Sequence, residues 1–448
     1  MTTPSPPAAA PAAPPSWRSA RRARLGWYGY DWANSVFTTS VTSVFFGPYL
    51  TDAARAAAGP DGSVHPLGLS ISAASYVPFV IGLSVFLQIF VLPTAAALTT
   101  RHHKGRLLGV LLLIGGGAAT AMYTIGETDY LLGGALFVLA TIALGGSITV
   151  CNTYLPVIAP PERQDRTSAE ASAAGFLSAG LILVVDLIVY NSHDRLGLTE
   201  SEAIRIIMMT AGLWWLVFGA LSVMLLRGYG APATTPATTP AAARIGSYRL
   251  LARALRDLRQ YPAAGWFLVA FLLYFNGVQA VTGLVGTYAV EALRLELDQV
   301  IVAVLVVQFA AVVGTAALGR VAERYGGRAV LIGSVLFWCA VIITGGVLPA
   351  GWFGGFLALC VSAGLVVGGT YALSRSVFIR LVPADRVPEY VGIFETVNRC
   401  LGFLGPAAFG LVLQWTGNYR LAWLSILVFL VAGAVTLVAA PRPEVSHG

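Results

Sequence analysis

A polar stripe inside an apolar stretch is the first feature of this sequence that could do chemistry. Asp31, Asn34, Ser35, Thr38 and Thr42 recur at the spacing of one helical face. Carboxylate, amide and hydroxyl groups that share a face can bind a polar solute by hydrogen bonding. The stripe therefore indicates the wall of a solute cavity. The alternative is a local structural role for Asp31, such as pairing with an arginine.

Asp186 is the one charged residue in a stretch, Leu181 to Val189, that is otherwise wholly apolar. An unpaired charge in such surroundings is strongly disfavoured, and burial favours the neutral carboxyl group. A carboxyl group that gains and loses a proton could couple solute movement to a proton gradient. The alternative is an ion pair between Asp186 and a basic residue on a neighbouring helix.

A second polar stripe consists of Asn276, Gln279 and either Thr282 or Gly283. Amide groups both donate and accept hydrogen bonds, so Asn276 and Gln279 could bind the ammonium and carboxylate groups of a zwitterion. Polar contacts between packed helices would explain the same residues equally well.

Three more charged side chains within predicted spans are candidates for substrate binding or coupling. The planar guanidinium group of Arg375 matches two carboxylate oxygens, which makes this residue a candidate for holding a substrate carboxylate. Glu395 and Arg399 are four positions apart, so they share a helical face and could neutralise each other.

These side chains must be positioned by membrane-spanning helices. The chain has 448 residues, of which 56% are hydrophobic and 11% charged, whereas soluble domains carry roughly 25% charged residues. Apolar runs of about 20 residues suffice for a helix to cross the hydrocarbon, and lipid requires each segment to pair its own backbone groups. We predict an all-α polytopic membrane protein with twelve crossings. They are residues 28–50, 70–98, 107–125, 131–159, 168–191, 204–226, 263–290, 299–319, 329–349, 352–381, 389–415 and 420–440.

The basic residues lie in short clusters between the apolar runs, which excludes a nucleic-acid-binding face and indicates topology instead. Their excess in alternate loops predicts that both termini are cytosolic. A single lysine, Lys104, among many arginines favours a bacterial plasma membrane. The predicted parts are a disordered basic tail (1–26), a six-helix half (27–226), a cytosolic linker with an amphipathic helix (227–262), a second six-helix half (263–440) and a cytosolic tail (441–448). The basic amphipathic pattern of the linker helix suits the anionic inner leaflet, and a solvated linker helix would explain it equally well.

A repeat relates the two predicted halves. Pro160 and Pro383, Arg163 and Arg386, and Arg101 and Arg324 are each separated by 223 positions. Two pseudo-symmetric six-helix halves related as parallel repeats are the organisation of major facilitator transporters.

The loop from Gly319 to Arg328 resembles the signature loop of that superfamily, G-x-x-A-D/E-R-x-G-x-K/R. Gly319 would let neighbouring helices approach, and Gly326 with Gly327 would permit a tight turn. Glu323, Arg324 and Arg328 could form an ion-pair latch at the membrane surface. The counterpart loop in the first half is degenerate, with Ala96 and Thr100 at the glycine and acidic positions.

Further motifs resemble the vacuolar amino-acid effluxer-like branch of the superfamily, the "unknown major facilitator" family. They are Tyr30-Asp-Trp-Ala-Asn-Ser35 with Pro48-Tyr49, Asn152-Thr-Tyr-Leu-Pro156, Gly368-Gly369 with Ser374-Arg-Ser376, and Gly405-Pro406. Asn152 joins the candidate residues for substrate binding or coupling through this resemblance. The chain departs from the branch at Val157, Tyr371 and Asp186. The resemblance implies movement of small solutes, with neutral amino acids the best-known class.

We therefore predict a monomeric secondary active transporter that moves a small solute by alternating access, with a proton as the candidate coupling ion. A multidrug or antibiotic exporter and a non-transporting receptor or scaffold are the alternatives. The sequence lacks the nucleotide-binding loop G-x-x-x-x-G-K-[S/T], so no ATP is implied. His102 and His103 do not share a helical face, and we predict no enzyme, cofactor or metal site.

Overall fold

The computed structural model describes residues 17–98, 104–159, 161–227, 229, 256, 260–382, 390, 394 and 402–441. Helices make up most of this part of the chain, and a single two-stranded hairpin accompanies them there. The candidates Glu395 and Arg399 lie outside the described residues. So do Arg101, Pro160, Pro383 and Arg386 of the predicted repeat and all of the predicted linker helix apart from Arg256.

The first group of helices follows the chain to residue 225. Its long elements are α1 (Trp17–Val36), α3 (Ala73–Leu98), α4 (Lys104–Ala121), α5 (Tyr130–Asn152), α7 (Pro161–Asn191) and α8 (Glu200–Leu225). Between α1 and α3 lie the π-helix η1 (Phe37–Phe45), the helix α2 (Phe46–Ala56) and the strands β1 (Ser63–Val64) and β2 (Ile71–Ser72), with the 3-10 turn η2 (Pro66–Gly68) between the strands. The short elements η3 (Met122–Thr124), α6 (Leu155–Ile158) and η4 (Asp194–Leu196) connect the others.

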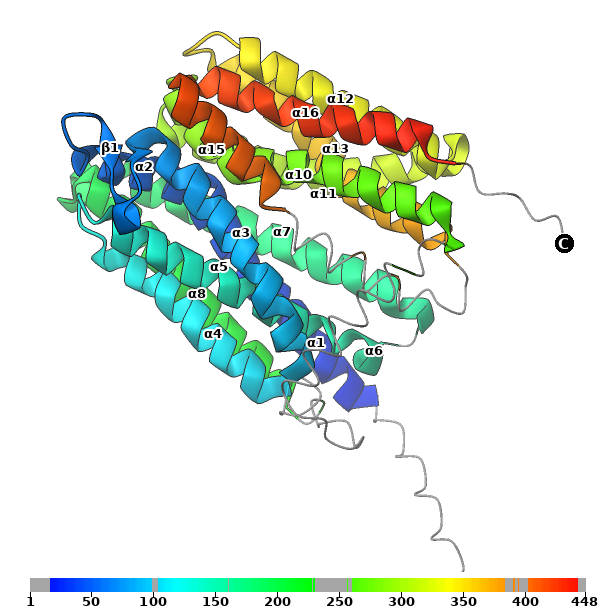
Figure 1. Ribbon diagram of the computed structural model, residues 1–448. Helices are drawn as coiled ribbons and strands as arrows, with labels where there is room; N and C mark the ends of the chain where they lie inside the picture. Colours follow the sequence, from blue (N-terminus) through cyan, green and yellow to red (C-terminus); the bar gives the residue numbers. More distant parts are fainter. Residues whose placement is uncertain are drawn as a thin grey trace, which may run out of the picture.

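The second group comprises α10 (Pro262–Glu291), α11 (Leu297–Tyr325), α12 (Gly327–Val347), α13 (Phe353–Ile379), α15 (Leu404–Thr416) and α16 (Tyr419–Ala439). Within it, α11 packs on α13 and α10 packs on α16; within the first group, α4 packs on α5 and α8, and α1 packs on α7 and α8. The groups lie side by side (Figure 1), and they meet where α3 packs on α15, α7 on α11, and η1 and α2 on α10.

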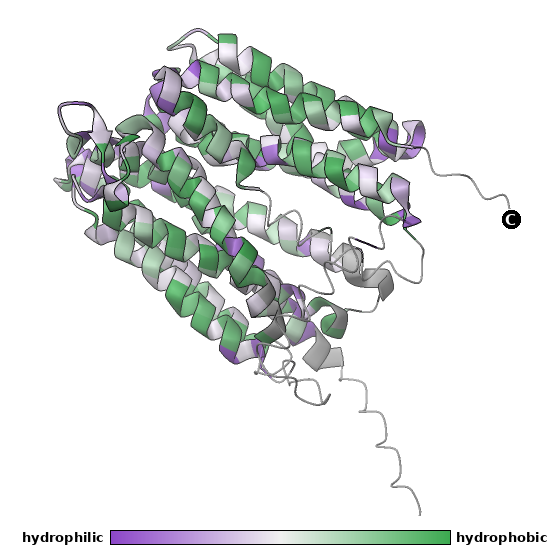
Figure 2. Ribbon diagram, in the orientation of Figure 1, coloured by the Kyte–Doolittle hydropathy of each residue, from purple (hydrophilic) through white to green (hydrophobic). Residues whose placement is uncertain are grey.

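Ten helices in the described part of the chain are long and apolar enough to cross a membrane. They correspond to ten of the twelve predicted crossings. The first predicted crossing is the continuous run of α1, η1 and α2, and α15 is the described end of the eleventh. Apolar residues run along the middle of the helices and hydrophilic residues gather near their ends (Figure 2). This distribution is the one that a lipid environment selects.

The ends of several helices are set by local chemistry. Thr199 and Glu202 form a capping box that begins α8, and Glu296 with Gln299 does the same for α11. Gly326 has φ +87°, which L side chains rarely adopt, so the chain can turn from α11 directly into α12. This confirms the tight turn predicted for the Gly319–Arg328 loop.

Glycines allow α11 and α13 to approach closely. A Cβ atom on Gly314 would lie 2.0 Å from the backbone oxygen of Leu365, and one on Gly368 would lie 2.2 Å from the hydroxyl oxygen of Thr315. Gly369 packs in the same way against Leu318. The Gly368-Gly369 motif therefore serves helix packing within the second group.

Gly314→Ala should lower the stability of the folded protein by about 1–3 kcal/mol, because the added methyl group meets backbone atoms that cannot turn aside. Gly319→Ala on the same helix is the control, since no described residue lies within 4 Å of a Cβ atom added there. Thermal unfolding in detergent would measure both. Equal melting temperatures for the two variants would contradict the packing argument.

Candidate functional site

The first predicted crossing is interrupted by a π-helix at its centre. Pro48 has no backbone N–H and so cannot donate the α-helical hydrogen bond to Val44. Upstream of it, Phe46 bonds five residues back to the carbonyl oxygen of Val41, and the hydroxyl of Ser43 likewise donates to the carbonyl oxygen of Thr38 at 3.0 Å. Such π-segments occur frequently at functional sites. The interruption places η1 against α7, α10 and α11.

Asp186 is buried on α7, where 1% of the residue is exposed. Its Oδ2 atom accepts a hydrogen bond of 2.6 Å from Ser40 Oγ, and Ser40 is fully buried in η1. No ion pair of Asp186 occurs among the described residues. Among the described residues, this carboxyl group thus has a neutral hydroxyl as its hydrogen-bond partner in an apolar setting. The sequence did not identify Ser40 as this partner.

The polar stripe of the first crossing divides into two parts. Asp31, Ser35, Thr38 and Thr42 are partly exposed, as expected for one face of a helix that lines a cavity. Asn34 is instead buried, with 5% of the residue exposed. Its Nδ2 atom has no hydrogen-bond partner among the described residues.

The stripe on α10 divides in the same manner. Gln279 is exposed in the middle of α10, which packs against η1 and helices of both groups, and Thr282 and Gly283 follow it on a partly exposed face. Asn276 is buried, with 4% of the residue exposed. Its Nδ2 atom donates to the carbonyl oxygen of Leu272 at 2.7 Å, which leaves its Oδ1 atom without a partner in the described part of the chain.

Asn34 and Asn276 therefore offer complementary unused groups on the first and seventh crossings. With the amides oriented as they are here, the unused group of Asn34 is an N–H donor and the unused group of Asn276 is an oxygen acceptor. Buried polar groups are nearly always satisfied, so an unused donor and an unused acceptor in the protein interior both need a partner. A carboxylate and an ammonium group would supply those partners.

Arg375 is partly buried on α13, one turn beyond Tyr371. The ring of Tyr371 lies 5.3 Å from that of Phe275 and 6.3 Å from that of Phe394. Phe271 stacks on both phenylalanines, at 5.1 Å from Phe275 and 4.1 Å from Phe394. An aromatic cluster thus adjoins the helix face that carries Arg375.

The Asn152–Pro156 motif ends α5. Asn152 itself is exposed, whereas Tyr154 is fully buried. Lys104 donates to the carbonyl oxygen of Thr153 at 3.1 Å and lies 5.5 Å from the centre of the Tyr154 ring. The contacts of this motif in the described residues thus tie the start of α4 to the end of α5.

Trp27, three residues before the Tyr30–Ser35 motif, and Gly405 of the Gly405-Pro406 motif make packing contacts. The indole nitrogen of Trp27 donates to the carbonyl oxygen of Cys151 at 3.1 Å, which joins α1 to α5. A Cβ atom on Gly405 would lie 2.6 Å from the carbonyl oxygen of Asn276, so this glycine brings α15 against α10.

The Gly319–Arg328 loop does not form the predicted ion-pair latch among the described residues. Arg328 donates instead to the carbonyl oxygens of Leu437 at 2.9 Å and Ala440 at 2.5 Å. The last carbonyl groups of a helix have no partners within it, so a guanidinium group beside the end of α16 is drawn to them. Glu323 is exposed, and Arg324 lies over the ring of Tyr325. None of the residues that the structure describes approaches within 4 Å of a Cβ atom added to Gly319.

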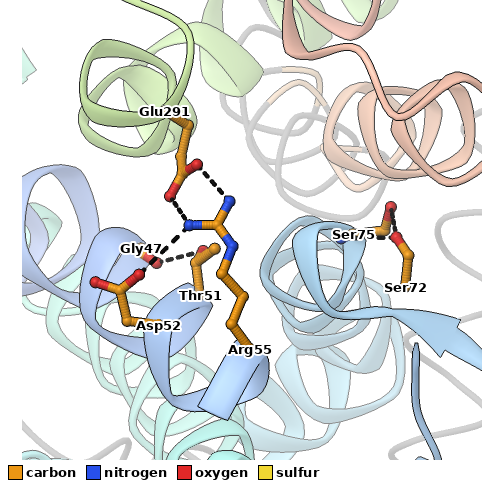
Figure 3. Close-up of polar contacts among 7 residues, drawn as sticks. All are labelled: Gly47, Thr51, Asp52, Arg55, Ser72, Ser75 and Glu291. Atoms are coloured by element: carbon orange, nitrogen blue, oxygen red, sulfur yellow. Dashed lines mark hydrogen bonds and ion pairs between the residues drawn. The ribbon is translucent and has the colours of Figure 1, made fainter. Parts of the chain in front are cut away.

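The opposite end of the molecule carries the β1–β2 hairpin and the last turns of α2 and α10, and we call it the hairpin end (Figure 1). Here Arg55 of α2 contacts Glu291 of α10, as Figure 3 shows. Neither Arg55 nor Glu291 was among the candidate residues predicted from the sequence. The sequence did contain a signal for this pair, because Arg55 follows the end of the first predicted span and Glu291 follows the end of the seventh.

Comparisons with known proteins agree with this architecture. The profile of the family described as "Vacuole effluxer Atg22 like" matches residues 19–174 and 161–444. The chain is 23% identical over 419 residues to the "Uncharacterized MFS-type transporter YxiO" of Bacillus subtilis, covering 93% of this chain and 94% of that protein. It is 28% identical over 284 residues to "Autophagy-related protein 22" of Cryptococcus neoformans, covering 59% of this chain and 50% of that protein.

Among solved structures, a variant of the nucleoside transporter NupG has a similar fold. The TM-score is 0.70 at 11% sequence identity, with 95% of this chain and 100% of that chain covered. At this identity the likeness concerns the fold alone, which is that of the major facilitator superfamily.

Proposed function

We propose the function of this chain from the premise that it belongs to the Atg22-like vacuole effluxer family and is a multi-pass membrane transporter of the major facilitator type. It is a transporter rather than an enzyme. Our proposal is that it moves a small zwitterionic solute, in the first place a neutral amino acid, by secondary active transport with a proton as the coupling ion.

The observation that carries the substrate class is the unused donor of Asn34 and the unused acceptor of Asn276. A neutral amino acid brings a carboxylate for the first and an ammonium group for the second. The description of the family as a vacuole effluxer supports the movement of a solute across a membrane. Arg375 is the further candidate for the carboxylate, and Asp31 and Gln279 for polar contacts along the cavity.

In this proposal the two groups of helices are the two halves of an alternating-access transporter, and both termini face the cytosol of a bacterium. The hairpin end is then the outer face of the plasma membrane. The bacterial relative that matches nearly the whole chain supports this location. The loop latch of Glu323, Arg324 and Arg328 would form at the cytosolic face only when that face closes.

Purified protein in liposomes tests the proposal. We expect radiolabelled neutral amino acids to accumulate when a pH gradient is imposed, and to accumulate less when the gradient is collapsed. Movement of lipophilic cationic dyes without any amino-acid flux would support the exporter alternative, which the aromatic cluster around Tyr371 would suit. Absence of all solute flux under every gradient would contradict the transport proposal.

Asn34→Ala and Asn276→Ala should each raise the KM for the amino acid by roughly tenfold or more, because a hydrogen bond to a charged group contributes about 1.5–3 kcal/mol. Asn191→Ala, which changes an exposed asparagine at the end of α7, is the matched control. Initial uptake rates over a range of concentrations would measure this. If the KM in both variants equals that of the control, the two amides do not bind the solute.

A further inference from the structure

The hairpin end holds a contact between the two halves that nothing above explains. We propose that Arg55 and Glu291 are gating residues. Their ion pair closes the outer end of the transport path, and Asp52 receives Arg55 when that end opens. The inference rests on the proposed alternating access and concerns which residues control one of its two states.

The pair has the geometry of a strong charged contact. Arg55 Nη1 donates to Glu291 Oε1 at 2.6 Å and Arg55 Nη2 donates to Glu291 Oε2 at 2.5 Å, so the guanidinium group and the carboxylate meet through two parallel bonds. The two residues are 236 positions apart, and they join α2 of the first half to α10 of the second (Figure 3). In the described part of the chain, it is the ion pair that connects the halves.

Asp52 gives Arg55 a second partner on its own helix. Arg55 Nη1 lies 3.4 Å from Asp52 Oδ1, three residues earlier on α2. Of the Asp52 side chain 73% is exposed, whereas 5% of the Glu291 side chain is exposed. Separation of the halves would therefore leave Arg55 beside a hydrated carboxylate and would bring Glu291 into water. Neither charge would remain buried and unpaired, which is the arrangement that costs most.

Close packing of α10 against the first crossing, further from the hairpin end than the ion pair, supports the same closed state. A Cβ atom on Gly47 would lie 2.0 Å from the hydroxyl oxygen of Thr287, and one on Gly286 would lie 2.4 Å from the carbonyl oxygen of Ser43. Near the surface, the backbone N–H of Ser72 donates to the side-chain oxygen of Gln414 at 2.8 Å, which joins the start of α3 to α15. Three independent contacts thus hold the halves together at this one end.

A surface hollow adjoins Arg55, the more exposed member of the pair. A hollow of about 450 Å³ is lined by Arg55, Gly59, Ser72, Gln414 and Gly417, among others, at the junction of the two halves. Of the Arg55 side chain 44% is exposed. A pair that is hydrated on one side can break more readily than one enclosed by protein, as a gate requires.

Cysteine labelling from the outer side tests the proposal. Gly283→Cys places a thiol on a partly exposed face of α10, where an added Cβ atom meets none of the described residues within 4 Å. In right-side-out vesicles a membrane-impermeant maleimide should reach it slowly while the outer end is closed. Adding Glu291→Gln should raise the labelling rate roughly tenfold, equivalent to about 1.4 kcal/mol between the closed and open states. Vesicles that lack Gly283→Cys give the background from the native cysteines.

Arg195→Gln is the matched control, because it removes an exposed arginine from the loop between α7 and α8. It should leave the labelling rate unchanged. The charge exchange Arg55→Glu with Glu291→Arg should restore slow labelling, since the pair can form in the reverse sense.

Arg55→Gln gives a second way to break the pair, should Glu291→Gln fail to insert into the membrane. Unchanged labelling in every correctly inserted single variant would overturn the proposal, and so would fast labelling in the charge exchange. Labelling needs no solute flux. A negative labelling result would therefore contradict the proposed gate and would leave the proposed transport function untouched.

Discussion

Gly286→Ala should reduce solute transport roughly tenfold or more, whereas Gly283→Ala, less than one turn away on the same helix, should leave transport near the native rate. The added Cβ atom at position 286 would lie 2.4 Å from the carbonyl oxygen of Ser43 and 2.9 Å from that of Val44. Both are backbone atoms of η1, so relief requires α10 and the first crossing to separate. Overpacking of this kind costs about 1–3 kcal/mol, which disfavours the state closed at the hairpin end.

Initial uptake rates in liposomes, together with the maleimide labelling of the outer side, would measure this effect. Alanine has the higher helix propensity, by roughly 0.5–1 kcal/mol, so local helix stability alone predicts no loss in either variant. In the described part of the chain, position 283 has no neighbour within 4 Å of an added Cβ atom and therefore isolates the packing effect. Equal transport rates in the two variants would show that closure does not depend on this crossing.

Asp186→Asn should abolish accumulation driven by a pH gradient while preserving exchange of solute across the membrane. The asparagine side chain has nearly the same shape, and its oxygen can still accept the hydrogen bond from Ser40 Oγ. What it lacks is an exchangeable acidic proton. The expected loss of gradient-driven accumulation, of roughly tenfold or more, therefore reports coupling rather than folding.

Asp194→Asn is the control, since this aspartate is exposed in the loop after α7. Accumulation and exchange would be measured in the same liposomes with and without an imposed gradient. If gradient-driven accumulation in the Asp186 variant equals that of the control, Asp186 does not carry the coupling proton. Loss of both accumulation and exchange would point to a structural role for the bond to Ser40.

The prediction of a helical membrane protein needed little more than local information. The ten membrane-length helices agree with ten of the predicted crossings, and their bounds differ from the predicted ones by a few residues at most ends. The length of each apolar run and the charge of each loop can be read from the sequence, because each segment interacts with the lipid independently of the others. The π-helical interruption at Phe37–Phe45 was not predicted, although Pro48 was its signal.

The candidate site was predicted less completely. Helical spacing grouped Asn34 with Asp31 and Thr38, yet the structure buries the asparagine and leaves the other two partly exposed. A residue at the edge of a helical face can point toward a neighbouring helix while the rest of the face does not. The spacing of residues along the sequence does not show which helix will be that neighbour. The position of Arg328 illustrates the same limit. Its partners are carbonyl groups at the end of α16, more than a hundred positions away.

By itself the sequence determined the membrane location, the helices and the family, because hydropathy, loop charge and short motifs are properties of contiguous segments. Only the tertiary structure decided which side chains meet. Ser40 bonds to Asp186 across 146 positions and Arg55 to Glu291 across 236. Each buried polar group needs a hydrogen-bond or ion-pair partner, but many residues along the chain could be that partner. The packing of the helices selects the one that does.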